Sequence, residues 1–204
     1  MACAGLLALA ACGDREAFRA HRDNTWVSFK RIQTELQRPR FLDATFPNPG
    51  GKTEVRRYYQ GPLILRTCGE QAAPPQAAGE ERSLCLVLEL DPARLDTASA
   101  GDSFRIEGVG EFRLVIDVTM VLFTPRPQHS PAIQRAWAEL QCSSAGLRAS
   151  SVTQTVQGQL TLSQVAKDSL AGRVQLTVSG ELGEGECGTA TGPAEFHFTF
   201  NVRG

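Results

Sequence analysis

The chain has 204 residues, of which 42% are hydrophobic and 21% are charged, and its formal net charge is −1. This length suits one domain that buries a core, and the near-zero net charge excludes a general electrostatic attraction to nucleic acid. The charges are unevenly distributed, because residues 13–66 carry eleven Lys or Arg and six Asp or Glu, whereas residues 67–204 carry ten and sixteen. The positive N-terminal part is either an ordinary solvated surface or a region that lies near anionic lipid headgroups.

The first eleven residues, MACAGLLALAA, carry no charge, and a charged segment begins directly after Cys12. Such a stretch is too short to cross a bilayer, which requires about 20 residues, and the small residues at its end are typical of a secretory signal. Residues Leu9, Ala10, Ala11 and Cys12 resemble the lipobox of bacterial membrane lipoproteins. The resemblance implies that the signal is removed before Cys12 and that the Cys12 thiol carries diacylglycerol.

The resemblance also implies an address and a domain organisation. A signal peptide normally carries Lys or Arg ahead of its apolar stretch, and residues 1–11 contain none, so they are expected to be a truncated signal peptide. We interpret residues 12–24 as a lipid-anchored tether and residues 25–204 as a single β-rich domain. The protein is expected in the cell envelope, facing the periplasm or the cell surface. In Gram-negative lipoproteins, an Asp directly after the lipidated cysteine is associated with retention at the inner membrane. Here Gly13 stands between Cys12 and Asp14, so the resemblance favours the outer membrane.

The cysteine content favours disulfide bonds. Of the six cysteines, one lies in the signal and one is the lipid attachment site, which leaves four: Cys68, Cys85, Cys142 and Cys187. An even number is typical of an oxidising compartment, and no spacing matches a zinc site or a redox motif. Sequence alone permits three pairings. We predict Cys68–Cys85 and Cys142–Cys187, because the first pair brackets a Pro-, Ala- and Glu-rich segment that suits a closed loop.

Several segments in the first half of the domain favour strands. Residues 25–39 are ambiguous, because their apolar residues fit both helical spacing and the beginning of a strand. Residues 53–59, 61–68 and 83–90 are rich in side chains that suit strands.

The clearest signals are alternating runs of apolar and polar residues. Residues 111–123 place an apolar side chain at every second position from Phe112 to Leu122 and predict one strand. Residues 173–179 predict a strand with Val174, Leu176 and Val178 directed inward. Residues 195–202 place three phenylalanines and a valine on one face, which predicts a second sheet that covers them: Phe196, Phe198, Phe200 and Val202.

One helix is predicted near residues 131–142. Ser130 suits an N-cap and Pro131 suits the first helical position. The apolar residues that follow recur at i, i+3, i+4 and i+7: Ile133, Ala136, Trp137 and Leu140. Numerous strands with Gly-rich turns and without βαβ alternation predict a mainly β fold. We expect an antiparallel two-sheet sandwich or a flattened barrel with this one short helix.

Local motifs for catalysis are absent from the sequence, which contains no GxSxG, HExxH or SxxK. The histidines are far apart: His21, His129 and His197. Two acidic groups are either turn residues or ligands for a hard cation: Asp91, Asp96 and Asp102, and Glu181, Glu184 and Glu186. The turn interpretation is preferred because neither spacing matches a metal motif. No metal or cofactor is expected.

The preferred candidate binding patch is the run Arg56, Arg57, Tyr58 and Tyr59, which contains both tyrosines of the chain. Arg and Tyr are enriched at recognition surfaces, where they stack on sugars or bind phosphates. Neighbouring residues of a strand point to opposite faces, so only one Arg and one Tyr can share a surface.

The sequence therefore predicts a lipid-anchored, non-catalytic envelope lipoprotein. Its partners are the membrane, through the N-terminal lipid, and an envelope protein or glycan bound on one face of a sheet, with no nucleic acid. The alternative is an envelope hydrolase whose site forms only when distant residues converge in the fold. A cleft that gathers a histidine with carboxylates would favour this alternative.

Overall fold

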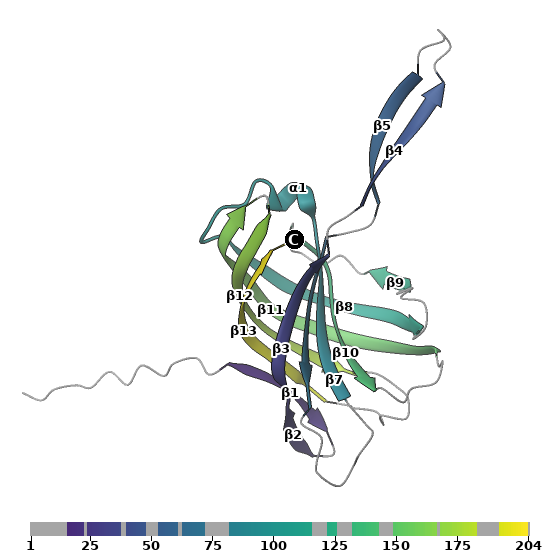
Figure 1. Cartoon of the computed structure of the whole chain (residues 1–204). Coiled ribbons are helices and arrows are strands. Elements are labelled where there is room, and N and C mark those ends of the chain that lie inside the picture. Colours follow the sequence, from purple (N-terminus) through teal and green to yellow (C-terminus); the bar gives the residue numbers. More distant parts are fainter. Residues whose placement is uncertain are drawn as a thin grey trace, which may run out of the picture.

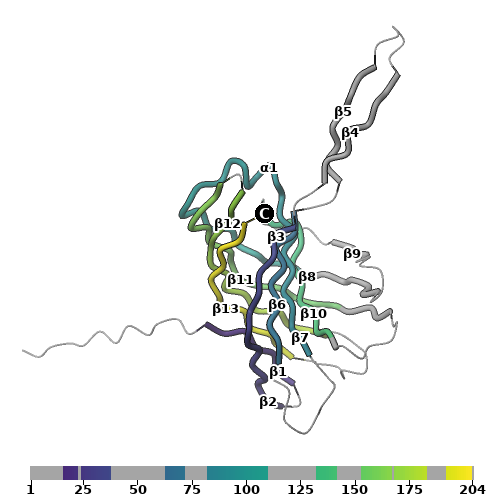
Figure 2. Tube along the Cα trace, viewed as in Figure 1, coloured from purple at the N-terminus to yellow at the C-terminus, as the bar shows by residue number. Residues whose placement is uncertain are grey.

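The computed structural model describes residues 16–22, 24–37, 40–47, 53–60, 63–71, 82–115, 122–125, 132–142, 149–166, 168–182 and 192–203 (Figures 1 and 2). Within this part of the chain the elements follow one another in this order: β1 (Ala17–Arg22), β2 (Thr25–Ser28), β3 (Lys30–Gln37), β4 (Arg40–Pro47), β5 (Thr53–Gln60), β6 (Leu63–Glu70), β7 (Arg82–Leu90), α1 (Pro92–Leu95), β8 (Ser103–Val115), β9 (Leu122–Pro125), β10 (Ile133–Cys142), β11 (Ala149–Ala166), β12 (Ser169–Gly180) and β13 (Ala194–Arg203).

The described strands form two main sheets and one separate pair. The large sheet has seven strands in the order β2-β1-β13-β12-β11-β8-β9, and the small sheet has four in the order β10-β7-β6-β3. Strands β4 and β5 pair with each other, and every described pairing is antiparallel. The strands of the small sheet run across those of the large sheet (Figure 1). The predicted mainly β, antiparallel two-sheet sandwich is confirmed.

The core lies between the two sheets. On β13 the inward residues predicted from the sequence are at most 7% exposed: Phe196, Phe198, Phe200 and Val202. On β12, Val174, Leu176 and Val178 are at most 1% exposed. The small sheet covers these side chains with a row of leucines from β7, each at most 1% exposed: Leu84, Leu86, Leu88 and Leu90. Both predicted inward faces and the predicted covering sheet are therefore confirmed.

The predicted disulfide between Cys68 and Cys85 is present. The two cysteines lie directly opposite each other on β6 and β7. Cys142 is the last residue of β10, and Cys187 lies outside the described residues, so the pairing of these two stays a prediction.

The helix predicted near residues 131–142 is wrong, because Ile133–Cys142 form β10, which pairs with β7. The predicted start of that helix lies outside the described residues. The error has a physical reason, since β10 is buried on both faces. Ala138 faces the core and is 0% exposed, and Trp137 on the opposite face is only 4% exposed. A strand buried on both sides does not alternate, so its apolar residues match a helical spacing equally well.

The single strand predicted over residues 111–123 is also wrong. The chain reverses between Val115, where β8 ends, and Leu122, where β9 begins, and the two strands pair in an antiparallel manner. Both arms of a hairpin keep the same two-residue period, so alternation alone does not reveal the reversal.

The tether predicted over residues 12–24 is too long. Residues Ala17–Arg22 form β1, which pairs with β13 and β2 and so belongs to the large sheet. Its inward side chains Phe18 and Ala20 are 3% and 2% exposed. This strand has only two buried apolar positions, Phe18 and Ala20, so its alternating run is too short to be recognised in the sequence. The ambiguous residues 25–39 contain strands as well, β2 and β3.

The described part of the chain has one helix, the single turn α1. Asp91 caps it, because its side chain accepts a hydrogen bond from the Ala93 N–H at 2.9 Å, and Pro92 occupies the first helical turn. In the described residues no helix has the length and apolar character needed to span a membrane.

Candidate binding site

A groove lies at the corner where the chain passes from the large sheet to the small one. A single residue, Phe29, stands between β2 of the large sheet and β3 of the small sheet. Phe29 is 5% exposed, and its N–H donates to the Phe18 carbonyl at 2.8 Å. We call this feature the β1–β3 groove; its volume is about 780 Å³. The residues that line it are Glu16, Ala17, Phe18, Arg19, Ser28, Phe29, Lys30, Arg31, Ile32, Glu195 and His197.

The floor of the β1–β3 groove is apolar and belongs to the core. Phe18 packs edge to face against Phe196, with ring centroids 4.8 Å apart. Gly69 of β6 lies against both floor residues, because a Cβ at this position would stand 3.0 Å from Phe18 Cδ1 and 3.0 Å from Phe29 Cβ. The missing side chain of Gly69 thus lets the two phenylalanines approach the small sheet closely. A floor packed in this way is rigid.

Arg19 connects two neighbouring strands on the outer face of the large sheet. Its Nη2 and Nε donate to Glu195 Oε2 at 2.6 Å and 2.8 Å, and Glu195 is its partner in the β1–β13 register. The guanidinium carbon of Arg19 lies 4.5 Å from the centroid of the Trp26 ring on β2, and His21 packs edge-on against the same ring. Although held by these contacts, Trp26 is still 40% exposed.

Arg31 lines the groove from a strained backbone position. Its φ is 51°, in the left-handed region that costs a non-glycine residue on the order of 1 kcal/mol. Arg31 lies where the register of β3 against β6 shifts, between Lys30 and Gln33. Its side chain is 76% exposed, and its Nη1 lies 3.1 Å from Glu70 Oε2.

The rim of the groove mixes both signs of charge. Its titratable side chains are Glu16, Arg19, Lys30, Arg31, Glu195 and His197. Lys30 differs from the two arginines because it has no ion-pair partner among the described residues. Cations that line an apolar floor, with the exposed indole of Trp26 beside one of them, suit a ligand or surface that has both anionic groups and apolar parts.

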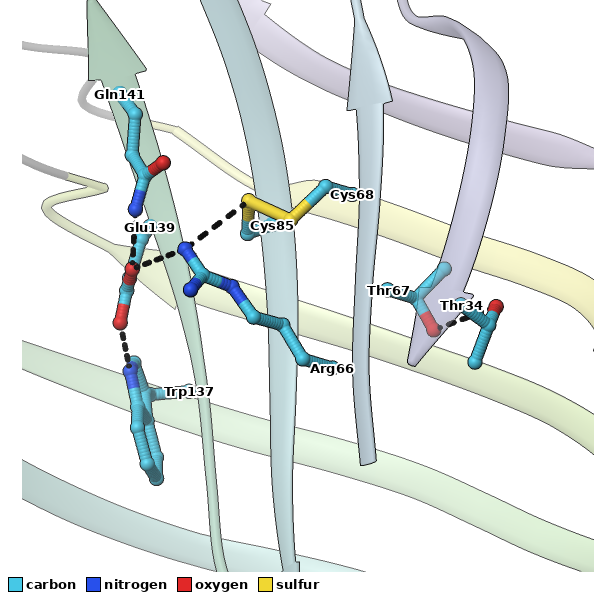
Figure 3. The surroundings of a disulfide bond; sticks show 8 residues. All are labelled: Thr34, Arg66, Thr67, Cys68, Cys85, Trp137, Glu139 and Gln141. Carbon is cyan, nitrogen blue, oxygen red and sulfur yellow. Dashed lines mark hydrogen bonds and ion pairs between the residues drawn. A yellow bond between two sulfur atoms is a disulfide. The ribbon is translucent and has the colours of Figure 1, made fainter. Parts of the chain in front are cut away.

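A second polar cluster lies around the disulfide on the outer face of the small sheet (Figure 3). Glu139 of β10 accepts hydrogen bonds from Trp137 Nε1 at 2.6 Å and from Gln141 Nε2 at 2.9 Å. Arg66 of β6 reaches across β7, so that its Nη2 lies 3.7 Å from Glu139 Oε2 and 3.8 Å from the Cys85 sulfur. The disulfide, the buried carboxylate and the three strands β6, β7 and β10 are thereby joined in one network.

Charged groups in this second cluster are buried. Glu139 is 5% exposed and Glu89 is 8% exposed. Burial raises the pKa of Glu89, while Arg135, whose Nε is 2.9 Å from Glu89 Oε2, lowers it. The Nε of Arg66 is buried and has no hydrogen-bond partner in the described part of the chain. The carboxylates of this cluster are paired with arginines, so the cluster joins neighbouring strands of the small sheet.

The patch preferred from the sequence belongs to β5. Arg56, Arg57, Tyr58 and Tyr59 are consecutive residues of β5, opposite residues 41–44 of β4. Their side chains lie outside the described part, so this binding patch stays a prediction.

The histidines and acidic groups are only partly described. His197 lines the β1–β3 groove and His21 contacts Trp26, whereas His129, Glu184 and Glu186 lie outside the described residues. Two of the remaining acidic residues have turn roles, because Asp91 caps α1 and Asp102 accepts a hydrogen bond from the Ser99 N–H at 2.8 Å. Asp96 ends α1 and Glu181 follows β12. In the described residues no group of three or more His, Cys, Asp or Glu side chains is arranged so that it could hold a metal ion.

Sequence reasoning missed Arg19, Trp26, Lys30 and Arg31. A usable signal was present in β1, where Phe18 and Ala20 alternate with Arg19 and His21. No family model, curated protein or solved structure matches the chain.

Proposed function

We propose that this protein is a lipid-anchored, non-catalytic envelope lipoprotein whose β-sandwich is a binding domain. The observation that carries the proposal is the position of the β1–β3 groove, because Glu16 and Ala17 line it directly after the segment that begins with Cys12. Ala17 is five positions after Cys12, so the chain between them spans at most about 18 Å, whatever its conformation. A lipid on Cys12 would therefore hold the groove at the bilayer.

Two further features support this address. The residues Leu9, Ala10, Ala11 and Cys12 resemble a lipobox, and the Cys68–Cys85 disulfide suits an oxidising compartment such as the periplasm or the cell surface. We propose the outer membrane as the site of anchoring, because the residue directly after Cys12 is Gly13 and not the Asp that is associated with retention at the inner membrane.

The decisive test is mass spectrometry of the mature N-terminus, from membranes of cells that express the gene with its upstream region. We expect a peptide that begins at Cys12 and carries two or three acyl chains. In the Cys12→Ala variant this peptide should be absent and the protein should leave the membrane fraction. An unmodified N-terminus in a soluble wild-type protein would contradict the proposal.

A second candidate, an envelope hydrolase, is favoured by one observation. The β1–β3 groove gathers His197 with Ser28, Glu16 and Glu195, which are the residue types of a serine hydrolase. Binding is the better-supported function, because Glu195 is engaged by Arg19 at 2.6 Å and, within the described chain, no hydrogen bond joins Ser28 to His197.

Activity assays separate the two candidates. Ester, peptide and glycan substrates are offered to the purified protein, to Ser28→Ala and to His197→Ala. Turnover that both substitutions abolish would establish the hydrolase, whereas turnover that survives both would come from a contaminant.

A further inference from the structure

We propose that the rim of the β1–β3 groove docks on the anionic surface of the membrane to which Cys12 is anchored. This inference rests on the proposed function, since the lipid on Cys12 brings the groove to the bilayer. The docking surface consists of three residues that line the groove, Lys30, Arg31 and Ile32, and of Trp26, whose ring lies against the groove residue Arg19. We call these four residues the rim surface.

Two large apolar side chains of the rim surface are exposed to solvent. Trp26 and Ile32 are 40% and 36% exposed, and among the described residues only Val109, on β8, is another large hydrophobic residue exposed to this degree. Trp is the side chain that favours the headgroup level of a bilayer, because its ring is apolar while its N–H remains a hydrogen-bond donor. Trp26 and Ile32 lie within seven positions on one corner of the sandwich, so an interfacial aromatic side chain stands near an exposed aliphatic one, as suits the interface of a membrane.

Cations accompany these apolar side chains. Lys30 lies next to Arg31 in the chain, and Lys30 has no ion-pair partner among the described residues. Arg31 reaches Glu70 only in an exposed pair, in which the side chains are 76% and 49% exposed, and exposed pairs exchange partners at little cost. Lys30 can therefore contact lipid phosphates directly, and Arg31 can do so by exchanging Glu70 for a phosphate. Each cation contributes about fivefold in affinity for an anionic surface.

A membrane suits this surface better than a small soluble anion. Arg19 already donates two hydrogen bonds to Glu195, at 2.6 Å and 2.8 Å. These donors are therefore not available to bind a small anion in the groove. The remaining contacts are spread over an open rim with apolar members. Figure 1 shows β1, β2 and the beginning of β3 together at one end of the molecule, away from α1. This is also the end to which Cys12 is linked by at most about 18 Å of chain.

Vesicle binding tests the proposal on the full chain carrying Cys12→Ala, with its disulfide intact, so that no acyl chain contributes. We expect it to bind vesicles of equal parts phosphatidylglycerol and phosphatidylcholine and to bind phosphatidylcholine alone much more weakly. Lys30→Gln with Arg31→Gln should weaken binding to the anionic vesicles by about 25-fold, two factors of about five. Arg105→Gln is the matched control, because Arg105 is 81% exposed and paired with Glu107 at 2.7 Å on β8.

Fluorescence tests the tryptophan directly, since the chain has two, Trp26 and the buried Trp137. Brominated lipid in the vesicles should quench the wild-type fluorescence, and Trp26→Phe, which keeps an aromatic ring for folding, should remove the quenching. Val109→Ala, at the other exposed hydrophobic position, should leave both quenching and affinity unchanged.

Three results would overturn the docking proposal: absence of vesicle binding, equal loss of binding in Arg105→Gln, and quenching that persists in Trp26→Phe. Competition by inorganic phosphate that removes vesicle binding would assign the cations to a soluble anion instead. These outcomes are separate from the lipoprotein proposal, which stands or falls on acylation of Cys12 in cells.

Discussion

At the scale of single residues, the buried carboxylate of Glu89 makes stability depend on pH. Burial raises its pKa above the ordinary value of 4.5, although Arg135 lowers it, so the folded protein binds this proton more tightly than the unfolded chain does. The stabilisation is fully present below pH 4.5 and is lost as the pH rises through the folded-state pKa. Relative to Glu89→Gln, the wild type should therefore lose free energy of unfolding as the pH is raised across this window.

Urea denaturation of both proteins at a series of pH values measures this effect. Glu107→Gln is the control, because Glu107 is 45% exposed and is also ion-paired, with Arg105 at 2.7 Å. The same pH dependence for both substitutions would contradict the assignment to Glu89.

Residues also decide how much of the candidate site could be read from the sequence. The run Arg56–Tyr59 forms a recognisable pattern because its members are adjacent in the chain. Arg19 and Glu195, by contrast, are 176 positions apart and meet only because β1 pairs with β13. A site assembled by strand pairing carries no local spacing, so only the outward alternation of β1 could have indicated half of it.

At the scale of elements, the Cys68–Cys85 bond locks β6 to β7. The cysteines are 17 positions apart, and closing a loop of this size stabilises the folded state by about 3 kcal/mol in the chain-entropy model. The double variant Cys68→Ala with Cys85→Ala should lose about this free energy of unfolding in urea. An unchanged denaturation midpoint would contradict the prediction. The double variant is preferable to a reducing agent, which would also act on any bond made by Cys142 and Cys187.

The elements show when a pattern in sequence predicts structure. Strands β12 and β13 have one buried and one less buried face, so their alternation predicted them correctly. Strand β10 is buried on both faces and resembled a helix, because the spacing of its apolar residues satisfied both periods. The reversal between β8 and β9 left the period intact and was missed. Correct prediction thus depended on a strand having two unlike faces and on the chain not reversing within the alternating run.

At the scale of the whole molecule, the two sheets are joined along the edge of β10 that faces away from β7. Gln154 of β11 is 1% exposed, and its amide pairs with the Ala138 backbone as a neighbouring strand would. Its Oε1 accepts from the Ala138 N–H at 3.0 Å, and its Nε2 donates to the Ala138 carbonyl at 2.8 Å and the Glu181 carbonyl at 2.7 Å. In register, Gln154 is flanked by two glycines, Gly110 and Gly180.

This junction predicts that Gln154 stabilises the sandwich as a whole. Gln154→Glu keeps the shape but removes the N–H donors, which sets a carboxylate against the carbonyls of Ala138 and Glu181, and Gln154→Leu removes every hydrogen bond. Each should lower the free energy of unfolding by about 2 to 4 kcal/mol, because buried backbone groups lose their partners. Gln159→Glu, at an exposed position of the same strand, should change it by less than about 0.5 kcal/mol. Urea denaturation measures all three, and equal losses at both positions would show that the closure of the two sheets does not depend on this amide.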